Sequence, residues 1–209
     1  GLAKTIAKGL GMREMPEPMP KALRRKVTPE VAKSPALSLM ARPGDAGIRA
    51  RRIALLVADG VSGPALEALA AQLAADGAVP RFVGSRLGSV QTAEGGAIEV
   101  DTTLEATPSV LYDAVVVPDG EAGVGRLADD GRAVEFLKDQ YRHCKAILVL
   151  GGGSRMLDRA GIPATLPSGS PDPGIVAAPA GRASSAAKAF TAAVAKHRHF
   201  ERETDPPRV

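Results

Sequence analysis

Short, unbroken apolar runs alternate along the chain with segments whose apolar residues recur every three or four positions. Residues 53–58 and 146–150 contain no polar side chain and stop just before an Asp-Gly pair and a run of three glycines. Such runs are typical of strands buried on both faces of a parallel sheet. The remaining expected strands are residues 79–83, 114–117 and 175–177, with short strands within 88–103 around a turn at Gly95 and Gly96.

Helical spacing of apolar residues fills most of the intervals between these strands. We expect helices over residues 2–10, 64–75, 132–143, 154–160 and 184–199. Ser62 is the expected cap of the helix that begins at Pro64. Because helices alternate with strands, the sequence predicts a doubly wound α/β fold with a mostly parallel sheet and right-handed crossovers.

Prolines break the pattern between the first helix and the first strand. Pro16, Pro18 and Pro20, followed by Pro29, Pro35 and Pro43, exclude regular structure over much of residues 11–50. We expect residues 1–50 to be a short helix and a linker, 51–203 to be the folded domain and 204–209 to be a tail. Because the chain begins with Gly1 and such a linker is unusual inside one compact domain, we expect a fragment whose linker leads to a second folded body.

Charge separates the linker from the domain. Residues 1–52 hold 12 Lys and Arg against 4 Asp and Glu, whereas the rest holds 15 against 19, so the net charge of +4 comes from the linker. The domain is mildly acidic and only 3% of the chain is aromatic, which argues against nucleic-acid binding. We also expect no membrane span, no disulfide and no cysteine-based zinc cluster, and a cytoplasmic location.

Three loops follow the expected carboxyl ends of strands, where ligands bind in sheets of this kind. These loops are residues 59–63, 118–125 and 151–155. The glycines at 151–153, before Ser154 and Arg155, offer either backbone amides for a phosphate or a tight turn, and the tight turn is the favoured interpretation. The loop is not a Walker sequence, because no Gly-Lys-Ser/Thr follows at the needed spacing.

Two segments carry a family resemblance. Residues 112–120 (YDAVVVPDG) and 145–153 (KAILVLGGG) resemble strands of the PfpI-like class I glutamine amidotransferase superfamily. In that family the second strand ends at a nucleophilic cysteine followed by histidine. Gly151 and Gly152 align with these two residues, and Ser62 aligns with the family's acidic partner. Asp119 replaces a glycine of the oxyanion loop, where a carboxylate would repel an oxyanion. The resemblance therefore implies a flavodoxin-like fold with a degenerate catalytic site and no catalytic residue of its own.

The remaining reactive side chains have structural interpretations. Cys144 precedes the strand that ends at Gly151, so about 20 Å of strand separates the two residues and a dyad with His143 is not expected at the loops. His197 and His199 do not share a helical face, and we interpret them as groups that complement the end of the last helix rather than as metal ligands.

A second resemblance covers nearly the whole chain. Residues 34–40 (SPALSLM), 42–45 (RPGD) and 51–60 (RRIALLVADG) resemble the linker and first strand of the C-terminal domain of large-subunit catalases. That resemblance implies a parent homotetramer that dismutates hydrogen peroxide with haem held in a core outside this chain. It further implies a non-catalytic domain whose partners are that core, sister subunits and unfolded client proteins, with roles in assembly stability, core access or chaperone-like protection.

Two other functions remain open. An independent PfpI-like hydrolase or glyoxalase-type enzyme requires a reactive thiol at the carboxyl ends of the strands. A nucleotide- or flavin-binding module would use the loop at Gly151. Flavodoxin-like flavin sites carry aromatic stackers, and this chain has two Tyr and no Trp.

Overall fold

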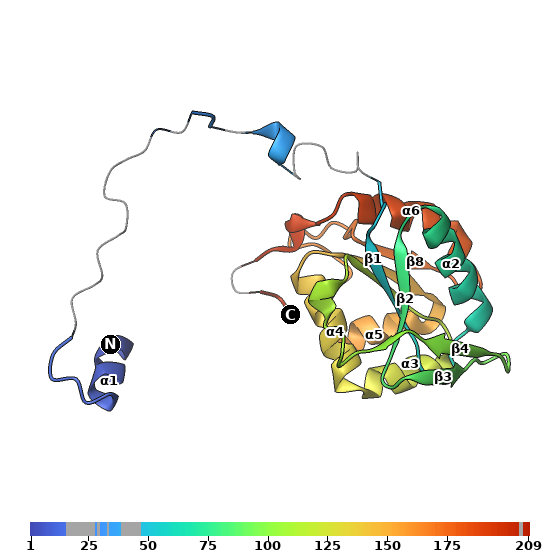
Figure 1. Ribbon diagram of the computed structural model, residues 1–209, viewed down its shortest axis with the longest axis horizontal. Helices are drawn as coiled ribbons and strands as arrows, with labels where there is room; N and C mark the ends of the chain where they lie inside the picture. The colour runs from blue at the N-terminus through green and yellow to red at the C-terminus, as the bar shows by residue number, and fades with distance from the viewer. Residues whose placement is uncertain (16–27, 29, 33, 39–46, 205–206) are drawn as a thin grey trace. The chain divides into compact units, whose positions relative to one another are not determined.

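A computed structural model describes residues 1–209 except 16–27, 29, 33, 39–46 and 205–206, and it contains two compact units, Gly1–Ser34 and Pro35–Val209 (Figure 1). In the first unit, residues Leu2–Gly9 form helix α1, as the spacing predicts. Its apolar side chains at Leu2 and Ile6, and that of Leu10 just beyond it, are exposed.

The second unit is built on a six-stranded sheet in the order β5-β2-β1-β6-β7-β8, and every neighbouring pair is parallel. The strands are β1 (Arg52–Leu56), β2 (Val79–Gly84), β5 (Thr102–Thr103), β6 (Ala114–Val117), β7 (Ala146–Leu150) and β8 (Ile175–Ala178). A separate antiparallel hairpin consists of β3 (Gly88–Gln91) and β4 (Ala97–Val100) around the expected glycine turn. The doubly wound α/β prediction is confirmed.

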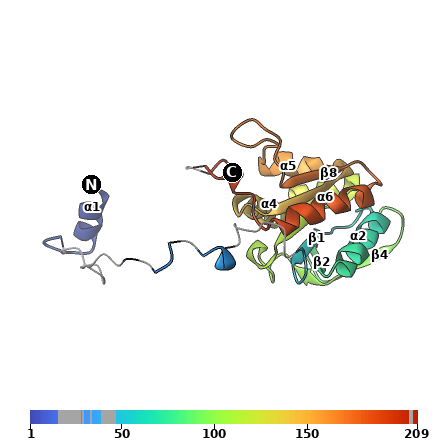
Figure 2. The same cartoon turned by 90° about the horizontal axis from the view of Figure 1, so that it is seen from above.

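Helices cover both faces of the sheet (Figures 1 and 2). Helices α2 (Gly63–Ala75) and α6 (Ala183–Ala195) pack in one apolar cluster with Ile53 and Leu55 of β1. Helices α3 (Glu121–Asp129), α4 (Gly131–Arg142) and α5 (Ser154–Ala160) pack in the other with Ala54 and Leu56. Successive residues of β1 from Ile53 onward thus enter opposite cores, which explains why residues 53–56 include no polar side chain.

Two helix predictions are wrong in part. The sequence predicts a loop over residues 118–125, but α3 begins at Glu121. Gly123 lowers helix propensity, yet a Cβ there would lie within 3.0 Å of the backbone of Gly60 and Val61, so the glycine permits close packing that outweighs its propensity. The last helix ends at Ala195 rather than at 199, because His197 has a φ of +71°.

The segments beside the predicted domain boundaries contact the domain. Ile48 is buried in the α2/α6 cluster, and the amide of Ala50 donates to the carbonyl oxygen of Gly77 (2.8 Å). At the other end, the guanidinium of Arg142 donates to the carbonyl oxygen of Val209 (2.8 Å). The boundaries at residues 50 and 203 remain predictions.

A buried ion pair joins the short 3-10 helix Phe200–Arg202 to the loop before β8. Arg202 donates through Nε and Nη2 to the carboxylate of Asp172 (2.6 and 3.1 Å) and through Nη1 to the carbonyl oxygen of Lys145 (2.6 Å). The two side chains are 1% and 0% exposed. Such a pair is costly to break, because the remaining charge stays buried without a partner.

We predict that Arg202→Met lowers the free energy of unfolding by about 3–5 kcal/mol, measured by urea denaturation. The matched control is Arg86→Met, because Arg86 pairs with Asp59 (3.4 Å) but its side chain is 68% exposed. The control should cost less than about 1 kcal/mol. Equal losses in the two variants would contradict the prediction.

Candidate functional site

Gly151 lies where β7 turns into α5, at the carboxyl edge of the sheet. It has a φ of +46° and opens a short 3-10 helix, Gly151–Gly153, that leads into α5. A glycine takes this left-handed conformation without the strain that a side chain would add. The backbone therefore turns sharply at the position that aligns with a nucleophile.

The carboxylate of Asp119 fills the space beside Gly151. Asp119 follows β6, and its Oδ1 accepts hydrogen bonds from the amides of Gly120 (2.8 Å) and Gly152 (2.9 Å). A Cβ at Gly151 would lie within 3.0 Å of the carboxyl carbon and both oxygens of Asp119. An internal carboxylate thus fills the space beside Gly151 and accepts hydrogen bonds from two amides that converge there.

Ser62 reaches the same place from the end of β1, but it does not cap α2 as the sequence predicts. Its amide donates to the carbonyl oxygen of Asp119 (2.9 Å) and its hydroxyl donates to Oε1 of Glu94 (2.8 Å). Oε2 of Glu94 instead accepts from the amide of Gly63 (3.0 Å), the first residue of the helix. These hydrogen bonds, first from Gly63 and then from Ser62, lower the pKa of Glu94.

Glu94 is the residue of this region that the sequence analysis missed. It lies in the turn of the β3–β4 hairpin, where acidic residues ordinarily face solvent, and no spacing pattern links it to Ser62. The bridge between Val61 and Thr92 brings the two loops together. The three loops that follow β1, β6 and β7 contain Ser62, Asp119 and Gly151. Hydrogen bonds to Asp119 join all three loops directly.

The glycine loop offers little to a phosphate. The amide of Gly152 is already bound by Asp119, and a Cβ at Gly153 would lie within 3.0 Å of the carbonyl oxygen of Pro118. This close backbone approach supports the tight-turn interpretation.

Among the residues that the structure describes, no group of three or more His, Cys, Asp and Glu side chains is arranged to hold a metal ion.

Cys144 lies at the opposite edge, between α4 and β7. Its side chain is buried, and its thiol donates to the carbonyl oxygen of Arg142 (3.9 Å). Burial raises the pKa of the thiol, which keeps it in the unreactive protonated form. The cysteine therefore lies where the sequence placed it, at a helix-to-strand junction remote from Gly151.

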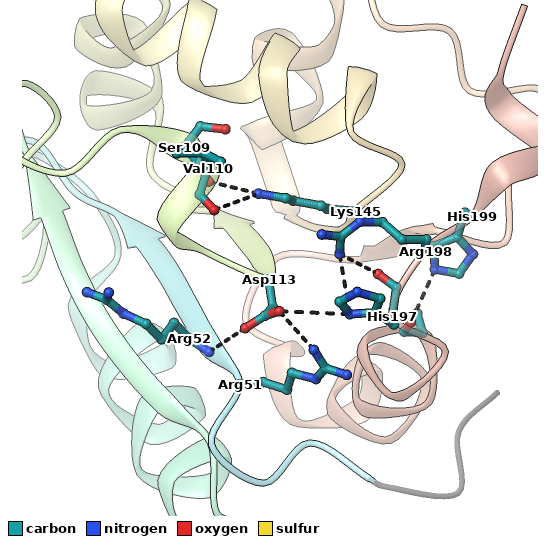
Figure 3. A network of polar contacts seen from close by, with 10 residues as sticks. Arg51, Arg52, Ser109, Val110, Asp113, Lys145, His197, Arg198 and His199 are labelled. Atoms are coloured by element: carbon teal, nitrogen blue, oxygen red, sulfur yellow. Dashed lines mark hydrogen bonds and ion pairs between the residues drawn. The ribbon is translucent and has the colours of Figure 1, made fainter. Parts of the chain in front are cut away.

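A polar network surrounds the amino ends of β1, β6 and β7 (Figure 3). Asp113 accepts from the guanidinium of Arg51 (3.0 Å) and the amide of Arg52 (2.9 Å), and Nδ1 of His197 lies 3.9 Å from its carboxylate. Nε2 of His199 lies 3.2 Å from the carbonyl oxygen of Ala193 in the last turn of α6. His199 therefore contacts the end of the helix, as the sequence suggested, although from beyond it.

Lys145 is the most buried cation of this network. It is 2% exposed, and its Nζ donates to the carbonyl oxygens of Ser109 (2.9 Å) and Val110 (3.4 Å). Burial lowers the pKa of its ammonium to about 8, and the nearby charge of Arg198 adds to this effect.

The sequence of this chain matches that of a known protein family. Residues 49–204 match the sequence profile of the C-terminal domain found in long catalases. The chain belongs to this family. The resemblance to large-subunit catalases that the linker and first strand carry is confirmed.

Two relatives named catalase HPII illustrate the extent of the match to long catalases. The one from Mycobacterium avium is 36% identical over 211 residues, which cover 98% of this chain and 29% of the relative. The one from Pseudomonas putida is 38% identical over 149 residues, or 71% of this chain and 20% of the relative. The chain thus spans less than a third of the length of either catalase.

Solved structures with a similar fold include proteins named for the ThiJ/PfpI domain and the DJ-1 superfamily. A ThiJ/PfpI domain protein from Brachyspira murdochii superposes with a TM-score of 0.57 and 20% identity, covering 70% of this catalase domain chain and 95% of that protein. A DJ-1 superfamily protein from Salmonella typhimurium gives 0.51 and 22%, covering 54% and 62%. These similarities confirm the flavodoxin-like fold.

No helix in the described part of the chain is long and apolar enough to cross a membrane.

The contact between Gly151 and Asp119 predicts a strong coupling in this catalase domain. Gly151→Ala should lower the free energy of unfolding by about 1–3 kcal/mol, because the new methyl overlaps the carboxylate. In an Asp119→Gly background the same substitution should cost clearly less, because the overlapping group is gone. Urea denaturation of the four proteins measures the coupling, and purely additive losses would contradict it.

The burial of Lys145 predicts a pH-dependent stability. Below pH 8 the amine is protonated in both states, but between pH 8 and 10.5 the folded chain releases a proton that the unfolded chain retains. The free energy of unfolding should therefore rise over this interval by about 1–3 kcal/mol relative to Lys145→Met, which keeps the apolar stem. Parallel pH profiles of the two proteins would show that Lys145 does not titrate as described.

Proposed function

We propose that this domain is a non-catalytic accessory part of a haem catalase. The single observation that carries the proposal is the Asp119 carboxylate held beside Gly151. A reaction of the amidotransferase type needs a nucleophile at that position and amides free to bind an oxyanion. Here the nucleophile is replaced by glycine, and a carboxylate already binds the amides of Gly120 and Gly152.

The other edge supports the same proposal. The thiol of Cys144 is buried, and its pKa is raised, so it does not supply the reactive group that an independent hydrolase or glyoxalase-type enzyme would need. In this proposal, peroxide dismutation belongs to a haem-containing core in the parent homotetramer, in the cytoplasm. The domain binds no cofactor itself and contacts that core and sister subunits.

The proposed role is to stabilise the assembly, and it is tested by removing the domain. The reference protein is the Mycobacterium avium relative with its matching region exchanged for this chain, and the test protein is the same relative with the region that matches residues 49–204 deleted. The kcat/KM for hydrogen peroxide should change less than about twofold, whereas the half-life at elevated temperature should fall at least about fivefold, as a loss of 1–2 kcal/mol would produce. An unchanged half-life contradicts the stabilising role.

Three further measurements separate the remaining roles. A large change in kcat/KM with an unchanged half-life would assign the domain to core access. Slower aggregation of a heat-stressed client at equimolar isolated chain would assign it a chaperone-like role. Peroxide turnover or amide hydrolysis by the isolated chain, lost in Cys144→Ser, would contradict the non-catalytic proposal.

A further inference from the structure

Three of the four strongly exposed large apolar side chains of the domain lie at one edge of the sheet. Among the described residues 49–204, four large apolar residues are strongly exposed: Leu87 (64%), Val110 (66%), Leu111 (43%) and Phe200 (40%). Leu87 lies between β2 and β3, beyond the carboxyl end of β2. The other three lie at the amino ends of the strands, in the 3-10 helix Ser109–Leu111 that precedes β6 and in the segment that follows α6.

The backbone beneath these side chains is fixed by buried hydrogen bonds. Nε2 of Gln140 and Nζ of Lys145 both donate to the carbonyl oxygen of Ser109 (2.7 and 2.9 Å). The amide of His199 donates to the carbonyl oxygen of Cys144 (2.7 Å), which fixes the residue before Phe200. The apolar side chains are therefore presented on an anchored framework, and exposed groups of this kind mark interaction sites more often than isolated ones do.

Cations lie at the same edge of the domain as this apolar group. Arg51, Arg198 and the buried Lys145 lie in the network of Figure 3 with Asp113 as its central carboxylate. Arg198 donates to its neighbour His197, at the carbonyl oxygen (2.9 Å) and at the ring nitrogen Nδ1 (3.4 Å). We define the edge surface as Val110, Leu111, Phe200, Arg51 and Arg198. A complementary partner would have an apolar centre and acidic groups around it.

The position of the edge surface indicates which partner it meets. Arg51 immediately precedes β1, so the chain enters the domain at this edge. The family is the C-terminal domain of long catalases, and the matched region is 29% of the Mycobacterium avium relative, so most of such a protein precedes the domain. A body joined through this entry is present at a high effective concentration near the edge surface.

We infer that the edge surface is the face by which the domain docks on the preceding body of a long catalase, at an apolar patch with an acidic rim. This inference rests on the proposed accessory function. The carboxyl edge, where Asp119 and Glu94 bind backbone amides of neighbouring loops, stays outside the interface.

The test uses the Mycobacterium avium relative with its matching region exchanged for this chain. After proteolysis within the linker, size-exclusion chromatography measures the fraction of the domain that still co-elutes with the remainder. The paired variant Val110→Asp/Phe200→Asp should reduce that fraction at least about tenfold, because acidic groups replace apolar contacts against an acidic rim. The matched control, Leu87→Asp, places the same change at the opposite edge and should leave the fraction unchanged. Thermal unfolding of the isolated chains checks that all variants fold.

Each outcome decides the inference. Co-elution lost in the pair and kept in Leu87→Asp supports it. Co-elution kept in the pair overturns the edge surface but leaves the proposed function intact. If the unsubstituted domain dissociates after cleavage, docking at this surface is overturned. The stabilising function is overturned only if removal of the domain also leaves the half-life of the catalase unchanged. Dimers of the isolated chain that the paired variant abolishes would assign the surface to a second copy and overturn the inference.

Discussion

The central strands of this domain are buried on both faces, and that burial decides where chemistry can occur. Residues 53–56 alternate between the α2/α6 cluster and the α3/α4/α5 cluster, so neither face of β1 has room for a polar side chain. The same holds for β6 and β7, whose residues are all buried. Polar groups are therefore confined to the two ends of the strands, where the backbone leaves the sheet.

At the carboxyl ends, Asp119 supplies hydrogen-bond acceptors to backbone amides. Backbone amides that converge on an empty pocket would lack acceptors, and buried donors without partners are costly. The Asp119 carboxylate accepts from two of them, and its carbonyl oxygen accepts from Ser62, so one residue ties together the loops after β1, β6 and β7. The carboxyl edge is thereby a closed structural junction.

Much of this arrangement could be predicted from sequence, because burial on both faces leaves a strong signal. Uninterrupted apolar runs located four of the six sheet strands, and their order placed Gly151 and Ser62 at the carboxyl edge and Cys144 at the other. The contribution of Glu94 could not be predicted, since the hairpin brings it to Gly63 from 31 residues away. Helix α3 was missed for a related reason: close packing of Gly123 on Val61 is a tertiary contact, and local propensity argues against it.

The two ends of the strands now have opposite characters. At the carboxyl end, charged groups bind the protein's own backbone, as Asp119 binds Gly120 and Gly152 and Glu94 binds Gly63. At the amino end, buried Lys145 holds the backbone in place while Val110 and Phe200 remain exposed above it. An enzyme needs the reverse, an open pocket at the carboxyl ends of its strands and an ordinary surface elsewhere. A domain closed at the carboxyl ends of its strands and apolar where the chain enters therefore supports the proposed accessory function, in which it contacts another folded body.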